Sequence, residues 1–157
     1  DEQTVEMIKK VVKEKNIHTL WFEAHYMYKN QLAMFAAQFE GVEVKFRCGV
    51  ESFDGELRER WKKGIAASVT AEDVAKYFQG VCLLCCTEGD SKGRILRDIA
   101  LAEQYFEYAS VNVFCENTTA IKRDDELAKW FVEEVYPELK ESGKIEVLVE
   151  NTDLGVG

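Results

Sequence analysis

The chain contains 157 residues, 46% of them hydrophobic, and its 29 acidic and 20 basic residues give a formal net charge of −9. This length and apolar content suit one domain with its own core, and the acidic balance argues against binding along a nucleic-acid backbone, which needs a basic face. Basic runs are limited to solvated pairs such as Lys62 and Lys63.

Neither a membrane span nor a targeting signal is evident. No run of about 18 apolar residues is present, so the sequence predicts no membrane-spanning helix. No signal peptide is recognisable at the start, and the cysteine count of five is odd. We therefore expect reduced thiols and a cytoplasmic protein.

Hydrophobic periodicity predicts alternating helices and strands along the chain. Apolar residues recur at helical spacing in QTVEMIKKVVKEK, whereas VEVKFRCGV alternates and GVCLLCC is continuously apolar, as in a strand buried on both faces. Thr70 to Asp73 form a capping-box pattern, and Pro137 is expected to kink or end the last helix. The predicted helices are residues 3–15, 29–39, 55–63, 70–78, 93–106 and 124–142, and the predicted strands are residues 18–23, 42–50, 80–86, 110–115 and 144–149.

The alternation of strands and helices predicts the fold class. Strands separated by helices imply right-handed crossovers and a parallel sheet. The predicted fold is a single α/β domain over residues 1–157, with five βα units and one parallel sheet. In such sheets ligands bind beyond the carboxyl ends of the strands.

Polar side chains collect at these predicted carboxyl ends. Each strand has a Glu near its end, and the last two strands are each followed by Glu-Asn-Thr, at 116–118 and 150–152. A single Glu at a strand end is usually solvated, and turns favour Asn and Thr, so only the set as a whole indicates a site. Carboxylates and amides suit a ligand with amino, hydroxyl and cationic groups. We expect convergence on one rim of Glu23, Arg47, Glu51, Glu116 and Glu150.

The run Cys82-Leu-Leu-Cys85-Cys86 resembles a CxxC metal motif but lies inside a predicted strand. Strand alternation would place Cys82 and Cys86 on one face and Cys85 on the other. Metal-binding pairs usually sit on loops, and no second pair stands at suitable spacing. The sequence therefore favours core packing and predicts no metal site.

The stretch GVESFDGELRERWKKG, followed by TAEDV, a strand and CTEGDSKGRILRDIALA, resembles the radical S-adenosylmethionine (radical SAM) superfamily. In many members a barrel strand runs into a GVQSFD-type segment, a helix and a Thr-Ala-Glu-Asp capping box, and the next strand runs into a GLPGET-like turn. Residues 49–54 match the first segment, with Glu51 where Gln is common. Residues 86–91 occupy the second and keep a Gly-acid pair. The family also has a GGE-like motif that contacts the amino group of SAM, and of this motif only Glu23 is present.

The family's CxxxCxxC motif, which supplies three thiolates to a 4Fe-4S cluster, is not found, because no Cys precedes Cys48. We expect the cluster loop to lie in an N-terminal segment of the same polypeptide outside this chain, which would then be the C-terminal portion of a partial (β/α) barrel. The resemblance implies SAM and a 4Fe-4S cluster in the full-length protein, with neither expected in this chain alone. Reductive cleavage of SAM would give a 5′-deoxyadenosyl radical that abstracts a substrate hydrogen.

The resemblance also implies roles for individual residues. SAM would lie across the strand ends, with its ribose and adenine over the second to fourth strands and Arg47 near its carboxylate. The implied SAM contacts are Glu23, Arg47, Glu51, Ser52, Asn112 and Glu116. The implied substrate contacts are Glu150, Asn151 and Asp153.

Two other functions stay open. The chain could be a complete α/β binding module for a nucleoside or other small polar ligand at the same rim. It could also be a metal or iron–sulfur carrier that uses Cys82, Cys85 and Cys86. Strand order separates the barrel from the binding module, because sequential neighbours indicate a barrel and a reversal of order indicates a doubly wound fold.

Overall fold

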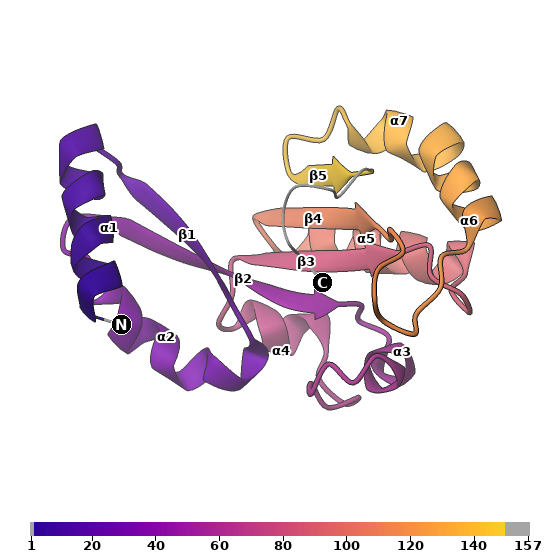
Figure 1. Cartoon of the computed structure of the whole chain (residues 1–157), viewed down its shortest axis with the longest axis horizontal. Coiled ribbons are helices and arrows are strands. Elements are labelled where there is room, and N and C mark those ends of the chain that lie inside the picture. The colour runs from indigo at the N-terminus through magenta and orange to yellow at the C-terminus, as the bar shows by residue number, and fades with distance from the viewer. Residues whose placement is uncertain (1, 150–157) are drawn as a thin grey trace.

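The computed structural model describes residues 2–149 and contains a five-stranded sheet (Figure 1). The strands are β1 Thr19–Ala24, β2 Glu43–Glu51, β3 Gly80–Cys85, β4 Tyr108–Val113 and β5 Ile145–Leu148. Their order is β1-β2-β3-β4-β5, and each neighbouring pair is parallel. This confirms the predicted α/β class, and the sequential order is the one expected of a barrel. The described sheet therefore lacks the reversal that a doubly wound fold requires.

The first helix precedes β1 and the other helices connect successive strands, and most of the helices begin at a side-chain cap. They are α1 Glu2–Lys15, α2 Leu32–Ala36, α3 Gly55–Arg60, α4 Ala71–Ala75, α5 Lys92–Tyr105, α6 Asp125–Trp130 and α7 Tyr136–Leu139. The predicted capping box at α4 is present, since the Thr70 side chain accepts from the Asp73 N–H and the Asp73 carboxylate from the Thr70 N–H. Within residues 2–149 no helix has the length and apolarity to cross a bilayer.

Two predicted helices are irregular. In place of one helix over residues 29–39, the structure has a 3-10 helix, Tyr26–Gln31, followed directly by α2. The last predicted helix is interrupted by a π-helical turn, Phe131–Val135, directly before α7, which carries Pro137 in its first turn. Proline has no N–H to donate, and its ring collides with the carbonyl four residues earlier, so a wider turn relieves this clash.

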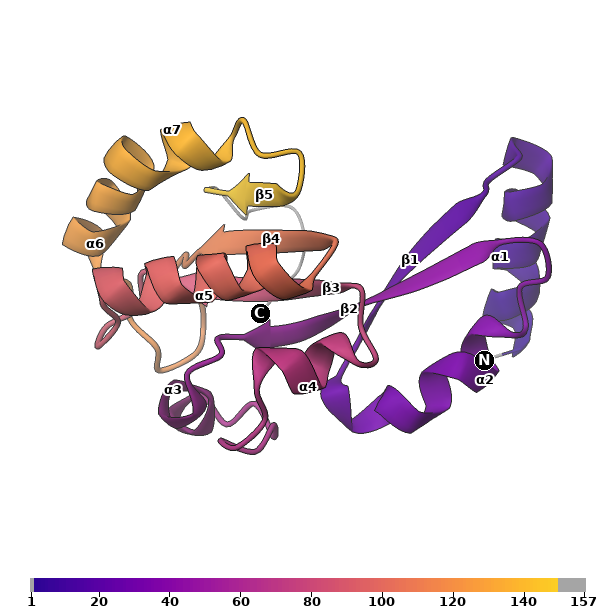
Figure 2. The same cartoon turned by 180° about the vertical axis from the view of Figure 1, so that it is seen from behind.

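The two faces of the sheet differ in chemistry. Helices α4 and α5 cover one face (Figure 2), where Cys48, Val81 and Val111 lie in the core. The opposite face, turned toward the viewer in Figure 1, carries the alternate side chains, among them Arg47 and Asn112, which are only partly buried. Because alternate residues point to opposite faces, one side of the sheet is apolar and helix-covered and the other polar and open.

The end of β3 differs from its prediction. The strand stops at Cys85, and Cys86 takes a φ of 66° instead of continuing the extended backbone. The carboxylate of Asp90 accepts the Cys86 N–H at 3.0 Å and holds this turn. As a result the buried thiols of Cys85 and Cys86 lie on the same side, with their Sγ atoms 3.6 Å apart. The expectation that they face opposite ways was therefore wrong.

Candidate functional site

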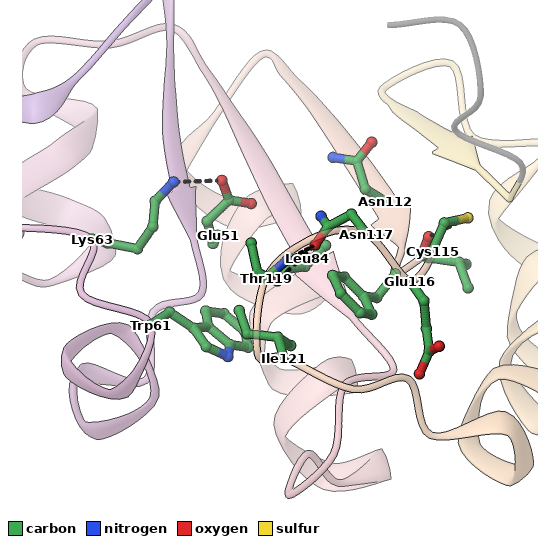
Figure 3. A pocket seen from close by; sticks show the side chains of 12 residues that line it. Glu51, Trp61, Lys63, Leu84, Asn112, Cys115, Glu116, Asn117, Thr119 and Ile121 are labelled. Carbon is green, nitrogen blue, oxygen red and sulfur yellow. Dashed lines mark hydrogen bonds and ion pairs between the residues drawn. The ribbon is translucent and has the colours of Figure 1, made fainter. Parts of the chain in front are cut away.

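A cavity of about 270 Å³ opens at the carboxyl ends of β2, β3 and β4 (Figure 3). Its walls come from these strand ends, the loop after α3 and the loop after β4, and include Glu51, Trp61, Lys63, Leu84, Asn112 and Ile121. Ligand cavities in proteins usually measure roughly 300–1,000 Å³, so this one lies just below that range and suits a group no larger than a nucleoside. Its position is the edge of a parallel sheet at which ligands are expected.

Glu51 and Lys63 form an ion pair at the mouth of this cavity, with Oε1 and Nζ 2.8 Å apart. Glu51 has a φ of 63°, and the register of β2 against β3 shifts between Cys48 and Glu51. Left-handed backbone at a residue other than glycine costs about 1–3 kcal/mol and is concentrated at functional sites. This strained strand end directs the Glu51 carboxylate toward the open face.

His25 fixes the loop that carries Lys63. The Met27 N–H donates to His25 Nδ1 at 3.2 Å, and His25 Nε2 lies 2.6 Å from the carbonyl oxygen of Lys63. Because Nδ1 accepts a hydrogen bond, the ring proton belongs on Nε2, which donates to Lys63. The end of β1 thereby braces the cavity wall that follows α3.

Glu23 and Arg47 face each other on β1 and β2. Arg47 Nε and Nη2 donate to Glu23 Oε2 at 3.2 and 3.1 Å, and the Cys82 thiol lies 3.7 Å from the same oxygen. Burial raises the pKa of the Cys82 thiol to about 11, so this thiol stays protonated and donates to the carboxylate. These three side chains form a polar cluster on the open face.

Gly49 leaves a gap between the two carboxylates. A Cβ atom at this position would lie 3.4 Å from Glu23 Oε1 and 3.8 Å from Glu51 Oε1. The structure therefore brings together three of the predicted rim residues, namely Glu23, Arg47 and Glu51, around a space that a larger side chain would fill. Along this rim the charges belong in turn to Arg47, Glu23, Glu51 and Lys63.

The other predicted SAM contacts lie in different surroundings. Asn112 lines the cavity and donates from Nδ2 to the Leu83 carbonyl at 3.1 Å. Glu116 also lines it, but its carboxylate points away from Asn112 (Figure 3). Ser52 is fully buried, and its hydroxyl donates to Asp98 at 2.6 Å, so it does not reach the cavity. The predicted substrate contacts Glu150, Asn151 and Asp153 lie outside the described residues.

The structure adds wall residues that the sequence did not indicate. Lys63 was interpreted as part of a solvated basic pair, and Trp61 and Ile121 lie outside the predicted strand ends. The sequence feature that could have predicted these wall residues is Trp61, a large aromatic residue in the otherwise polar loop between the GVESFD and TAEDV segments. Over residues 2–149 no group of three His, Cys, Asp or Glu side chains is arranged to hold a metal ion.

The sequential parallel sheet, its helix-covered outer face and the rim cavity define part of a partial (β/α) barrel of the radical SAM type. The structure is similar to that of a queuine lyase from Clostridium spiroforme bound to SAM and queuine, with a TM-score of 0.88 and 36% sequence identity. The match covers 99% of this chain and 66% of that chain. These values support a relationship to radical SAM enzymes. No protein-family model and no curated protein sequence matches the chain.

Proposed function

We propose that this chain is the C-terminal part of a radical SAM enzyme and binds SAM and a small-molecule substrate at the carboxyl rim of its sheet. The observation that carries the proposal is the 36% identity, over 99% of the chain, to an enzyme bound to SAM and queuine. SAM together with a 4Fe-4S cluster would supply the radical chemistry that removes a hydrogen atom from the substrate. The residues of this chain bind, orient and exclude water.

The rim charges fit the zwitterionic methionyl end of SAM. An ammonium group placed over Gly49 would lie between the Glu23 and Glu51 carboxylates, whose nearer oxygens are 3.4 and 3.8 Å from the position of a Cβ atom there. The Arg47 guanidinium uses Nε and Nη2 for Glu23, which leaves Nη1 to donate to a carboxylate. The ammonium and the carboxylate of the ligand thus each have a partner of opposite sign.

The cavity fits the nucleoside end. Trp61, Leu84 and Ile121 offer apolar surface for a purine ring, and Asn112 offers an amide close to the ends of β3 and β4. Glu116 would approach the ribose from the cavity edge after a change of rotamer. Ser52 would not contact SAM but would hold the backbone next to Glu51. The volume of about 270 Å³ suits a nucleoside but not all of SAM, which agrees with the methionyl group lying outside over Gly49.

The substrate is proposed to be a small polar molecule of the queuine type, which combines a purine-like base with a protonatable amine and hydroxyl groups. Glu150, Asn151 and Asp153 remain its proposed contacts. The formal net charge of −9 favours such a ligand over a nucleic acid.

The cluster is proposed to be held by a further segment of the same polypeptide. That segment would pair with the outer edge of β1, which within residues 2–149 pairs only with β2. Pairing would satisfy the free backbone N–H and carbonyl groups of this edge and cover Trp21, which is 41% exposed. The 66% coverage of the queuine lyase chain leaves room for such a segment.

The test is anaerobic reconstitution of the full-length protein with iron and sulfide, followed by SAM, a strong reductant and queuine. Formation of 5′-deoxyadenosine that requires both the cluster and Glu23 is expected, with Glu23→Gln as the variant and Glu138→Gln, on the outer helix α7, as the matched control. Binding of a nucleoside without any 5′-deoxyadenosine would instead support the stand-alone binding module and contradict the enzyme.

A further inference from the structure

The end of β2 is a strained turn centred on Glu51. The Ser52 N–H donates to the Val50 carbonyl at 2.8 Å, which closes a three-residue turn, and the central residue has a φ of 63°. A γ-turn with positive φ is rare, and a residue with a Cβ atom occupies it only where neighbouring groups enforce it. Something must therefore hold this turn from outside.

Ser52 is held on both sides by buried charged groups. Its hydroxyl donates to Asp98 Oδ2 at 2.6 Å, and its carbonyl accepts from Arg58 Nη1 at 3.1 Å. The exposed fractions are 0% for Ser52, 0% for Arg58 and 1% for Asp98. The same carboxylate oxygen of Asp98 accepts the Phe53 N–H at 3.3 Å, so the backbone after Glu51 is fixed at successive residues.

The same network reaches the end of β3. Arg94 Nη1 donates to Asp98 at 2.8 Å and to the Leu84 carbonyl at 3.2 Å. Arg94 also pairs with Asp90, whose carboxylate holds the left-handed turn at Cys86. Two charged side chains of α5 therefore fix two neighbouring strand ends, and both strand ends form walls of the cavity.

Stability alone does not account for these buried charges. Buried ion pairs are often no more stabilising than apolar residues of the same shape, because their desolvation offsets their attraction. Buried charged groups fix a geometry in some proteins, and the geometry that they fix here is that of two turns at the site.

We propose that Asp98 is a positioning residue for the candidate site, which acts through Ser52 to hold the strained turn that aims the Glu51 carboxylate at the cavity. The role of Glu51 toward SAM rests on the proposed function, whereas the mechanical link between Asp98 and Glu51 does not. Asp98 itself is buried and does not line the cavity.

The first arm of the test measures this link without any ligand. Amide hydrogen exchange at position 52 is compared among the wild type, Ser52→Ala, Ser52→Thr and Asp98→Asn. Loss of a hydrogen bond to a charged group is expected to speed exchange at this amide about tenfold in S52A and D98N, while S52T keeps its hydroxyl and its protection. Exchange at Val81 and Val111 in the sheet should not change. Unaltered exchange at position 52 in S52A would overturn the proposal.

The second arm measures the SAM affinity of the full-length protein, reconstituted with its cluster, in a double-mutant cycle. S52A and D98N are each expected to weaken binding about tenfold in the wild type but to add nothing in a Glu51→Gln background, because they act through that carboxylate. Equal losses in both backgrounds would contradict the proposal. Ser142→Ala, which removes a hydroxyl that accepts backbone N–H groups before β5, is the matched control and should leave affinity unchanged.

The two arms separate the possible failures. If the wild type does not bind SAM, the proposed function fails, and hydrogen exchange still decides whether Asp98 holds the turn. If D98N does not fold, S52A and its conservative partner S52T decide the question, since neither removes a buried charge.

Discussion

Glu51 and Lys63 lie 2.8 Å apart although one ends β2 and the other belongs to the loop after α3. Lys63 is in turn anchored through its carbonyl to His25 at the end of β1, across 2.6 Å. The end of β1, the end of β2 and the loop after α3 therefore meet at one side of the cavity. Of the contacts between them, the ion pair is the one that would face a ligand.

Replacement of Lys63 by Met is expected to weaken SAM binding about tenfold, because the Glu51 carboxylate loses the cation that orients it. The free energy of unfolding should change by less than about 1 kcal/mol, as for other ion pairs that water partly reaches. Calorimetric titration of the full-length protein with SAM measures the first effect, and urea unfolding measures the second. Lys76→Met, which breaks the exposed pair with Asp73, is the control and should leave affinity intact.

Gly49→Val is expected to block the methionyl subsite without unfolding the protein. The added side chain begins 3.4 Å from Glu23 and 3.8 Å from Glu51, a distance that the fold accepts, but it fills the space proposed for the ammonium group. SAM affinity should fall at least about tenfold while adenosine, which lacks that group, binds as before. Gly93→Ala, with nothing within 4 Å of the new Cβ, is the control. Normal SAM binding by G49V would place the ammonium elsewhere.

Arg47→Lys tests whether the guanidinium fork or only its charge is needed. Two donors of Arg47 engage Glu23, and a lysine ammonium cannot both keep that pair and offer a donor to a carboxylate. We expect R47K and Arg47→Met to lose SAM affinity to a similar degree, by roughly 1.5–3 kcal/mol. Full retention by R47K would show that the charge alone suffices. Titration against SAM and its decarboxylated analogue locates the contact, since only SAM should sense the change.

The cysteines should react with an alkylating reagent in an order set by burial and by the pKa of each thiol. Burial raises the pKa of Cys82 to about 11 and that of Cys48 to about 12, so both are protonated near neutrality and become thiolates only as the pH approaches those values. Alkylation by iodoacetamide at pH 8 should therefore modify the partly exposed Cys115 first and spare these two. Peptide mass spectrometry reads the order. Rapid modification of Cys82 at pH 8 would show that its thiol is neither buried nor held protonated.

We predict that this chain by itself binds no iron–sulfur cluster and cleaves no SAM. A cluster of the family type needs three thiolates on one loop, whereas Cys85 and Cys86 are buried in the core and Cys82 lies on the open face beside Glu23. Anaerobic incubation with iron and sulfide followed by a visible spectrum measures this. Stoichiometric cluster absorbance that disappears on changing these three cysteines to Ala would support the carrier function instead.

The sequence by itself determined the alternation of strands with helices and the parallel direction of the sheet. The alternation of apolar strands with capped helices depends on local periodicity, and parallel neighbours follow from the crossover rule. The capping roles of Thr70 and Asp73 follow from residue type and spacing alone. The same logic brought Glu23, Arg47 and Glu51 to one rim, because parallel strands end at the same edge.

Only the tertiary structure decided which polar groups face a ligand. Ser52 and Lys63 both lie in surroundings other than the expected ones. The Ser52 side chain is turned inward to a carboxylate on α5, and Lys63, whose carbonyl is held by a histidine on another connection, pairs with Glu51 at the cavity. The turn at Cys86 likewise depends on Asp90. Side-chain direction at a strand end is set by hydrogen bonds between segments distant in sequence, and the period-two rule stops applying where the extended backbone ends.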